Sequence, residues 1–152
     1  MIEDIIFNKV LIVPLVAWAL AQILKTALVM LRGKGLQLRF LFTSGGMPSA
    51  HSALVSALAT TVAWVSGTGS VAFAISTILA LVVMYDSTDV RYSVGQQSAV
   101  INRIVEEIKL RRPMTELKSD LRELVGHTPF QVFAGAALGI AVAWLWMSIA
   151  GV

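Results

Sequence analysis

Residues 45–52, Gly-Gly-Met-Pro-Ser-Ala-His-Ser, combine a helix start with a titratable side chain. Ser49 is placed to cap a helix that Pro48 helps to start, because its side-chain oxygen can accept a hydrogen bond from a backbone N–H of the first turn. A helix N-terminus offers unpaired N–H groups and the positive end of a dipole, which suit an oxyanion such as phosphate. His51, in the first turn, can exchange a proton near neutral pH. The stretch predicts either an anion site with an acid-base group or a histidine that only hydrogen-bonds to its neighbours.

Two cations on the first apolar stretch are placed to join such a site. Lys25 and Arg32 are seven residues apart, so on a helix they share one face and lie roughly 10 Å apart along the axis. An ionisable residue inside an apolar span is costly and is therefore a functional candidate. The alternative is that Lys25 snorkels to the membrane surface and Arg32 is only an interfacial anchor. Two cations and helix N-termini beside histidine suit a phosphate better than a metal ion.

The composition places the chain in a membrane. Of its 152 residues, 57% are hydrophobic and 14% are charged, and the mean hydropathy is +0.78, which is more than one soluble core of this size could bury. The absence of cysteine excludes thiolate nucleophiles and thiolate metal sites, and two histidines leave little for a zinc site. We therefore expect an integral membrane protein with no metal, no cofactor and no nucleic-acid partner.

The predicted architecture is an all-α integral membrane protein, with residues 1–152 forming a single membrane domain that contains four transmembrane helices. The expected spans are about residues 10–31, 49–65, 71–85 and 129–151. Between the third and fourth spans, apolar residues recur at helical spacing among charged ones. This pattern predicts a cytoplasmic amphipathic helical segment over about residues 86–125.

The distribution of charge orients these spans. Four spans place the two long loops on one side of the membrane and both termini on the other. All but two of the 12 Lys and Arg residues lie in those loops, so the positive-inside rule predicts that the loops are cytoplasmic. The second and fourth spans both begin on that side, at residues 48–49 and 128–129. The chain's only histidines, His51 and His127, are therefore expected at one face.

Three short motifs follow one another along the chain: Lys25-x6-Arg32, Pro48-Ser49-x-His51, and Gly126-His127 before a glycine-containing helix. In this order they resemble the three-part signature of the type 2 phosphatidic acid phosphatase and vanadium haloperoxidase superfamily. Three longer stretches look like its small divergent branch of membrane proteins, namely residues 45–52, Tyr85-Asp86-x3-Val90-Arg91 and residues 126–129. The resemblance covers nearly the whole chain.

The resemblance implies metal-free hydrolysis of a phosphate ester through a phosphohistidine. His127 would attack phosphorus as the nucleophile, and His51 would protonate the leaving oxygen as the general acid. The phosphoryl oxygens would be held by a hydroxyl and several cations, which are Lys25, Arg32, Ser49 and Arg91. Arg39 and Arg122 are open alternatives for completing this set.

The sequence departs from the superfamily pattern at Gln131, four residues after His127, where a carboxylate would orient and charge the nucleophile. The amide oxygen of Gln131 can accept a hydrogen bond but cannot stabilise an imidazolium. Loss of such a carboxylate in an analogous catalytic triad costs about 10⁴ in rate. Gln131 therefore keeps only an orienting role, and Asp86 or Asp89 is the candidate for supplying the missing charge.

The function we expect is that of a membrane lipid phosphate phosphatase in a bacterial cytoplasmic membrane, with its site facing the cytoplasm. The substrate would be a phosphomonoester such as phosphatidic acid, phosphatidylglycerophosphate or an isoprenyl phosphate. The alternative is a catalytically impaired protein that binds lipid phosphate or acts as a scaffold. A small transporter or channel subunit is disfavoured, because the polar residues cluster at one face and do not line a path across the spans. A homo-oligomer is compatible with the sequence.

Overall fold

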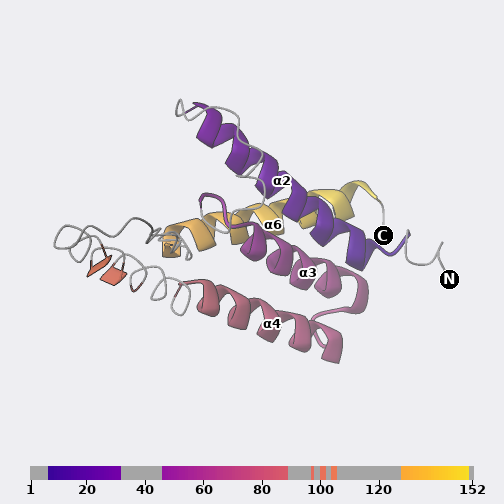
Figure 1. Ribbon diagram of the computed structural model, residues 1–152. Helices are drawn as coiled ribbons and strands as arrows, with labels where there is room; N and C mark the ends of the chain where they lie inside the picture. Colours follow the sequence, from indigo (N-terminus) through magenta and orange to yellow (C-terminus); the bar gives the residue numbers. More distant parts are fainter. Residues whose placement is uncertain are drawn as a thin grey trace.

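Four helices make up most of the computed structural model (Figure 1), which describes residues 7–31, 46–88 and 128–150 together with Gln97, Val100, Ile101, Ile104 and Val105. The helices are α2 (Lys9–Leu31), α3 (Ala50–Ser66), α4 (Val71–Thr88) and α6 (Pro129–Ile149). No strand occurs among these residues. The helix bounds agree with the four predicted apolar stretches to within three residues at every end, which confirms the all-helical prediction for the described chain.

The third helix is longer than the predicted span. It continues to Thr88, and in its last turn the hydroxyls of Ser87 and Thr88 donate hydrogen bonds to the carbonyl oxygen of Met84 at 2.8 Å and 3.2 Å. Asp86 therefore belongs to α4. Most of the predicted segment 86–125 lies outside the described residues, and the five described positions between 97 and 105 are helical.

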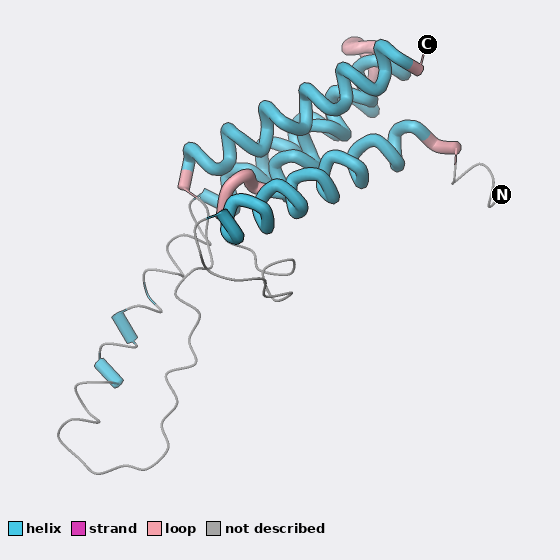
Figure 2. The backbone as a smooth tube through the Cα atoms, turned by 90° about the horizontal axis from the view of Figure 1, so that it is seen from above, coloured by secondary structure: helices cyan, strands magenta, loops and turns pink. Residues whose placement is uncertain are grey.

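Helix α3 lies at the centre of the bundle and contacts α2, α4 and α6 (Figures 1 and 2). The chain direction alternates from one helix to the next, so α2 and α4 end where α3 and α6 begin. We call this the loop end of the bundle; it is at the left in Figure 1. The first residue of α2 and the last residue of α6 lie at the opposite end, near the labels N and C.

Small residues predominate in the interior of the bundle. Ala17 and Ala57 lie in one buried apolar cluster, and Ala21 and Ala53 lie in a second cluster nearer the loop end. A Cβ on Gly139 would collide with the backbone of Ala53, so α3 and α6 are in direct backbone contact there. In a lipid solvent such contact replaces the hydrophobic effect as the force that holds helices together, because small residues allow close van der Waals packing.

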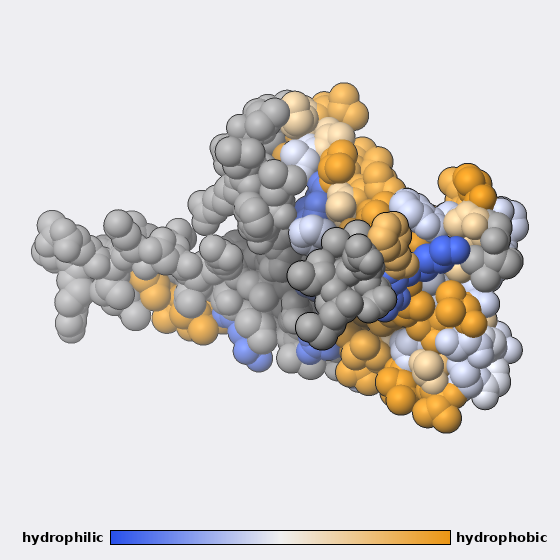
Figure 3. Space-filling model, turned by 90° about the vertical axis from the view of Figure 1, so that its right-hand side faces the viewer, coloured by the Kyte–Doolittle hydropathy of each residue, from blue (hydrophilic) through white to orange (hydrophobic). Residues whose placement is uncertain are grey.

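Large apolar side chains cover the outside instead. The exposed ones include Leu11, Trp18 and Ile23 on α2, Ile75, Ile78 and Val82 on α4, and Phe133, Ile140 and Trp144 on α6. Figure 3 shows patches of hydrophobic side chains, in orange, in the upper part and at the lower right of the molecule. Helices α2, α4 and α6 are each long and apolar enough to cross a membrane. Small residues inside and large apolar residues outside are the arrangement of an integral membrane protein.

Helix α3 is shorter, with 17 residues, and would measure about 25 Å against a bilayer core of about 30 Å. It is also the helix that the other three surround. Its passage through the bilayer, and hence a total of four spans, stays a prediction.

The contact between α3 and α6 can be tested with a single methyl group. Gly139→Ala should lower the midpoint of thermal unfolding in detergent, even though alanine favours a helix over glycine by about 1 kcal/mol, because its Cβ would overlap the Ala53 backbone. Gly69→Ala, in the turn after α3 where a Cβ meets nothing within 4 Å, is the control and should leave the midpoint unchanged. A Gly139→Ala protein as stable as wild type would contradict the backbone contact.

Candidate functional site

The N-terminus of α3 is closed by Ser49, as the sequence predicts. Ser49 is fully buried, and its Oγ accepts hydrogen bonds from the backbone N–H of Ser52 at 3.4 Å and from the Ser52 hydroxyl at 3.0 Å. Both lone pairs of the Ser49 oxygen are therefore occupied by donors from one residue. The proton of the Ser49 hydroxyl is the part of this group that remains for another acceptor.

The N-terminus of α6 is built from Thr128, Pro129 and Gln131. Thr128 is the N-cap and Pro129 is the first helical residue. This position suits proline, which has no N–H, because a backbone N–H there would have no partner within the helix. The side-chain Oε1 of Gln131 accepts the backbone N–H of Thr128 at 3.1 Å. Gln131 thus supplies the reaching-back bond of a capping box, a position that favours glutamine and glutamate alike.

A direct backbone bond joins the two helix starts. The N–H of Ser49 donates to the carbonyl oxygen of Gln131 at 3.1 Å. One turn further along α6, a Cβ on Gly135 would collide with the carbonyl oxygen of Ser49 and lie 3.0 Å from Cβ of Ser52. The N-termini of α3 and α6 consequently lie side by side at the loop end, and their positive dipole ends reinforce each other there.

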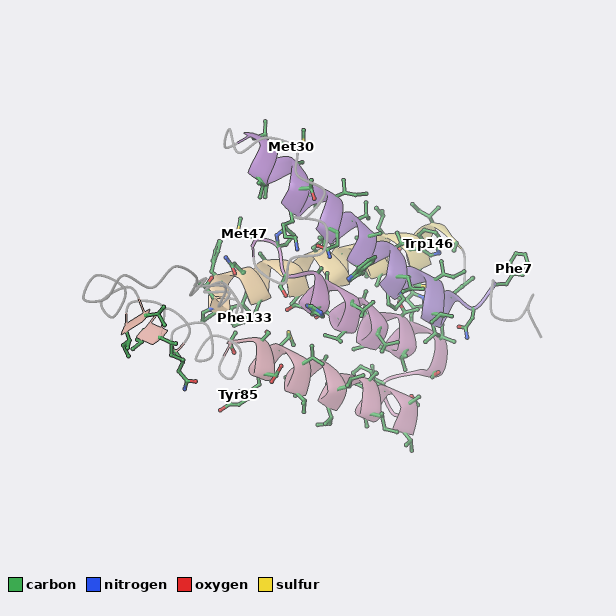
Figure 4. All side chains as sticks on the ribbon, in the orientation of Figure 1. Phe7, Met30, Met47, Tyr85, Phe133 and Trp146 are labelled. Carbon is green, nitrogen blue, oxygen red and sulfur yellow. The ribbon has the colours of Figure 1, made fainter. Side chains whose placement is uncertain are left out.

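Lys25 lies inside the bundle. It is only 3% exposed and follows Ala17 and Ala21 at intervals of four residues, so it continues the buried face of α2 towards the loop end. Its stem runs against Gly46, where a Cβ would come within 3.1 Å of the Lys25 Cδ. Gly46 also has φ +100°, a conformation that L side chains rarely adopt. Glycine at this position lets the chain pass over Lys25 just before α3 begins, near Met47 in Figure 4.

His51 and Asp86 are both half-buried at the loop end. His51 is the second residue of α3, and Asp86 lies in the last turn of α4. Asp86 lines a groove between α4 and α6 together with Pro129. The structure thus brings five of the predicted site residues to one end of the bundle, namely Lys25, Ser49, His51, Asp86 and Gln131.

The remaining predicted site residues lie outside the described part of the chain. His127, Arg32 and Arg91 belong to this group, as do the alternatives Arg39, Asp89 and Arg122. In the chain, Arg32 directly follows the last residue of α2, and His127 directly precedes the Thr128 cap. Within the described residues, no group of three or more His, Cys, Asp or Glu side chains is placed to hold a metal ion.

Sequence reasoning missed three contributors to this site. Ser52 was not predicted to hold the Ser49 oxygen, because an N-cap is recognised from the capping residue alone. The role of Gln131 as a cap was overlooked in favour of its expected position beside the nucleophile, although Thr128-x-x-Gln131 is a capping-box pattern. Gly135, which lets α6 approach Ser49, carries its own signal in the spacing Gly135-x3-Gly139.

The fold and the site define a helical membrane protein with paired helix N-termini, a buried lysine and a histidine at one end. The chain belongs to the divergent PAP2 family, whose model matches residues 6–142. It is also 37% identical over 148 residues to a Bacillus subtilis (strain 168) protein named "Uncharacterized membrane protein YuiD", with 90% of this chain and 92% of that protein covered. No solved structure matches the chain. The family match confirms the resemblance that the three motifs indicated.

The capping role of Gln131 predicts how two substitutions differ in stability. Gln131→Ala leaves the Thr128 N–H without its acceptor and should cost about 1 kcal/mol in the free energy of unfolding. Gln131→Glu keeps an acceptor at the same position and adds negative charge at a helix N-terminus, so it should be at least as stable as wild type. Thermal unfolding of the three proteins in one detergent is the measurement. Equal midpoints for the alanine and glutamate variants would show that the cap contributes nothing.

Proposed function

We propose that the protein hydrolyses a lipid phosphomonoester at the loop end of the bundle, through a phosphohistidine and without a metal ion. One observation carries the proposal: Lys25 is buried on the inner face of α2 and packs against the segment that leads into α3. A cation held inside a membrane bundle is costly, and such residues face the bundle interior where function requires them. A lysine that only snorkels would lie on the lipid-facing side, which Lys25 does not.

The proposed site binds a phosphate group by charge and by hydrogen bonds from helix ends. Lys25 supplies an ammonium group beside the N-terminus of α3, and Arg32 and Arg91 are proposed as further cations. The Ser49 hydroxyl would donate its proton to a phosphoryl oxygen, because both of its lone pairs accept hydrogen bonds from Ser52. Donors fixed in this way stabilise the charge that develops on the phosphoryl oxygens in the transition state.

In the first step, a ring nitrogen of His127 attacks phosphorus and the bond from phosphorus to the ester oxygen breaks. His51 gives its proton to that leaving oxygen, so the alcohol departs neutral. In the second step, a water molecule attacks the phosphohistidine while His51 takes a proton from it. Phosphate leaves, and both histidines return to their starting states.

We propose Asp86 as the charged partner of His127. The side-chain oxygen of Gln131 accepts a hydrogen bond from the Thr128 N–H, and the amide carries no charge that could stabilise an imidazolium. Asp86 reaches the same region from α4, because it lines a groove together with Pro129, the second residue after His127. A carboxylate from a neighbouring helix would then perform the task that the wider superfamily gives to a carboxylate on α6 itself.

A second candidate function is lipid-phosphate binding without turnover. The use of Gln131 as a cap favours it, because this position stabilises α6 whether or not catalysis occurs. The phosphate site would be the same in both cases. Only the fate of the bound ester distinguishes them.

Release of inorganic phosphate from a panel of lipid phosphates by the purified protein tests the proposal. We expect turnover in excess chelator, competitive inhibition by vanadate, and no turnover by His127→Ala. Lys25→Met should weaken binding of substrate and vanadate about tenfold or more without lowering the unfolding midpoint, because a buried charge-assisted bond is lost together with its desolvation cost. Lys9→Met, at the far end of the same helix, is the matched control.

Three results would decide between the candidates. Binding of lipid phosphate without release would establish the impaired binder. Unchanged turnover by His127→Ala would exclude the phosphohistidine mechanism. Unchanged binding by Lys25→Met, with vanadate inactive, would reduce Lys25 to a structural residue.

We further propose that the whole chain is one membrane domain with four spans in a bacterial cytoplasmic membrane, and that the loop end faces the cytoplasm. The relative in Bacillus subtilis is a bacterial membrane protein by name, and the basic loops favour this orientation. Because the chain has no cysteine, single-cysteine variants report sidedness directly. In intact cells an impermeant maleimide should label Gly69→Cys and should reach Lys34→Cys or Lys109→Cys only after permeabilisation. The reverse pattern would place the site outside.

A further inference from the structure

An open groove of about 770 Å³ runs between α4 and α6 at the loop end. Leu81, Val82, Tyr85 and Asp86 line it from α4, and Pro129 and Phe133 line it from α6. Figure 4 labels Tyr85 and Phe133, which come from the loop ends of the two helices. The groove is separate from the contact of α3 with α6 that joins Ser49 to Gln131.

The polarity of the groove changes along its length. Asp86 lies at the loop end, whereas Leu81 lies five residues back along α4 and hence roughly 7 Å deeper in the bundle. On α6, Phe133 is one turn deeper than Pro129. One end of the groove is therefore polar and adjoins the start of α6, and the other end is apolar and points towards the middle of the membrane-embedded region.

The groove is accessible from the lipid. Val82 is 59% exposed and Phe133 is 73% exposed, and both side chains belong to the outward faces that a bilayer would surround. A molecule entering here would diffuse in the plane of the membrane. A volume of this size falls in the range of about 300–1,000 Å³ that is common for sites that enclose small organic ligands.

We propose that this groove holds a hydrocarbon chain of the lipid phosphate, with the phosphate end of the molecule at the start of α6. The inference rests on the proposed function and extends it, since it assigns the part of the site that recognises the lipid. The apolar walls fit a hydrocarbon chain, and the groove begins beside the start of α6, which sets the orientation of the molecule. Pro129 connects the groove with the proposed phosphate site, because it lines the groove and is the second residue after His127 in the sequence.

The groove also explains how specificity for a membrane substrate would arise. The phosphate site alone would accept any phosphomonoester, soluble or lipid. Packing of a chain against the groove walls adds binding energy only for esters that carry one, and because the chain enters from the bilayer this energy comes from van der Waals contacts. Filling the groove should therefore weaken binding of long-chain esters and leave soluble esters unaffected.

Val82→Trp is the variant that fills the groove, and Ile78→Trp is its matched control. Ile78 is one turn away on the same face of α4, is 60% exposed against 59% for Val82, and does not line the groove. For dioleoyl phosphatidic acid, Val82→Trp should raise KM about fivefold, the ratio expected when roughly five to ten carbon–carbon van der Waals contacts are lost. Its kinetics with glycerol 3-phosphate, and all kinetics of Ile78→Trp, should match wild type.

A second pair of variants covers the case in which tryptophan turns away from the groove. Phe133→Ala removes one wall, and Phe130→Ala removes a side chain of similar exposure, 70%, that lies outside the lining. Only Phe133→Ala should change KM for the long-chain ester. Equal effects on the soluble ester, or equal effects of the control variants, would overturn the inference.

Photo-crosslinking separates this inference from the proposed function, since it requires no turnover. Full-length protein in nanodiscs is irradiated with a phosphatidic acid that carries a diazirine in its acyl chain, and the labelled peptides are identified by mass spectrometry. Labels should concentrate on residues 81–85 and 129–133 and should decrease in Val82→Trp. Equal labelling of exposed residues away from the groove, such as Ile23 on α2 and Ile75 on α4, would mean that the probe contacts bulk lipid only. That result would overturn the inference. Groove labelling in a protein that releases no phosphate would support lipid binding in the groove and would exclude the proposed phosphatase activity.

Discussion

Direct contact between the backbones of α3 and α6 is the constraint on which the loop end depends. The hydrogen bond from the Ser49 N–H to the Gln131 carbonyl can form only because Gly135 has no Cβ to collide with Ser49. The same contact fixes the first turns of both helices at one depth. His51 on α3 and the Thr128 cap of α6 are thereby brought to one end by main-chain atoms.

Burial of Lys25 follows from this arrangement. Close packing through alanine on α2 and α3 leaves a narrow interior, and the lysine stem extends along it to Gly46. The positive dipole ends of α3 and α6 lie at the same end of the bundle as this lysine. The Lys25 stem and the caps formed by Ser49 and Gln131 thus lie at one end of the bundle, although they come from three separate helices.

Much of this could be predicted from the sequence, because the relevant signals are local. Ser49 was recognised as a cap from its type and from Pro48, and the four helices were located from apolar runs and turn residues. The groove between α4 and α6 could not be predicted, since it depends on how far two helices diverge in space. The superfamily motif places Gln131 beside the nucleophile, whereas the helix-start pattern makes it a cap. Both assignments use the same amide oxygen, and only coordinates show that Thr128 occupies it.

The inside-out packing has a consequence for the evolution of the chain. In a soluble protein the large apolar residues are the ones that selection preserves, because they fill the core. Here most large apolar residues of the described helices face outward and need only remain apolar, so exchanges among Leu, Ile, Val and Phe at those positions should be tolerated. The positions held by glycine and alanine on α3 and α6 have no such freedom. Lineages of this family should therefore diverge fastest at their most hydrophobic side chains and slowest at their smallest ones.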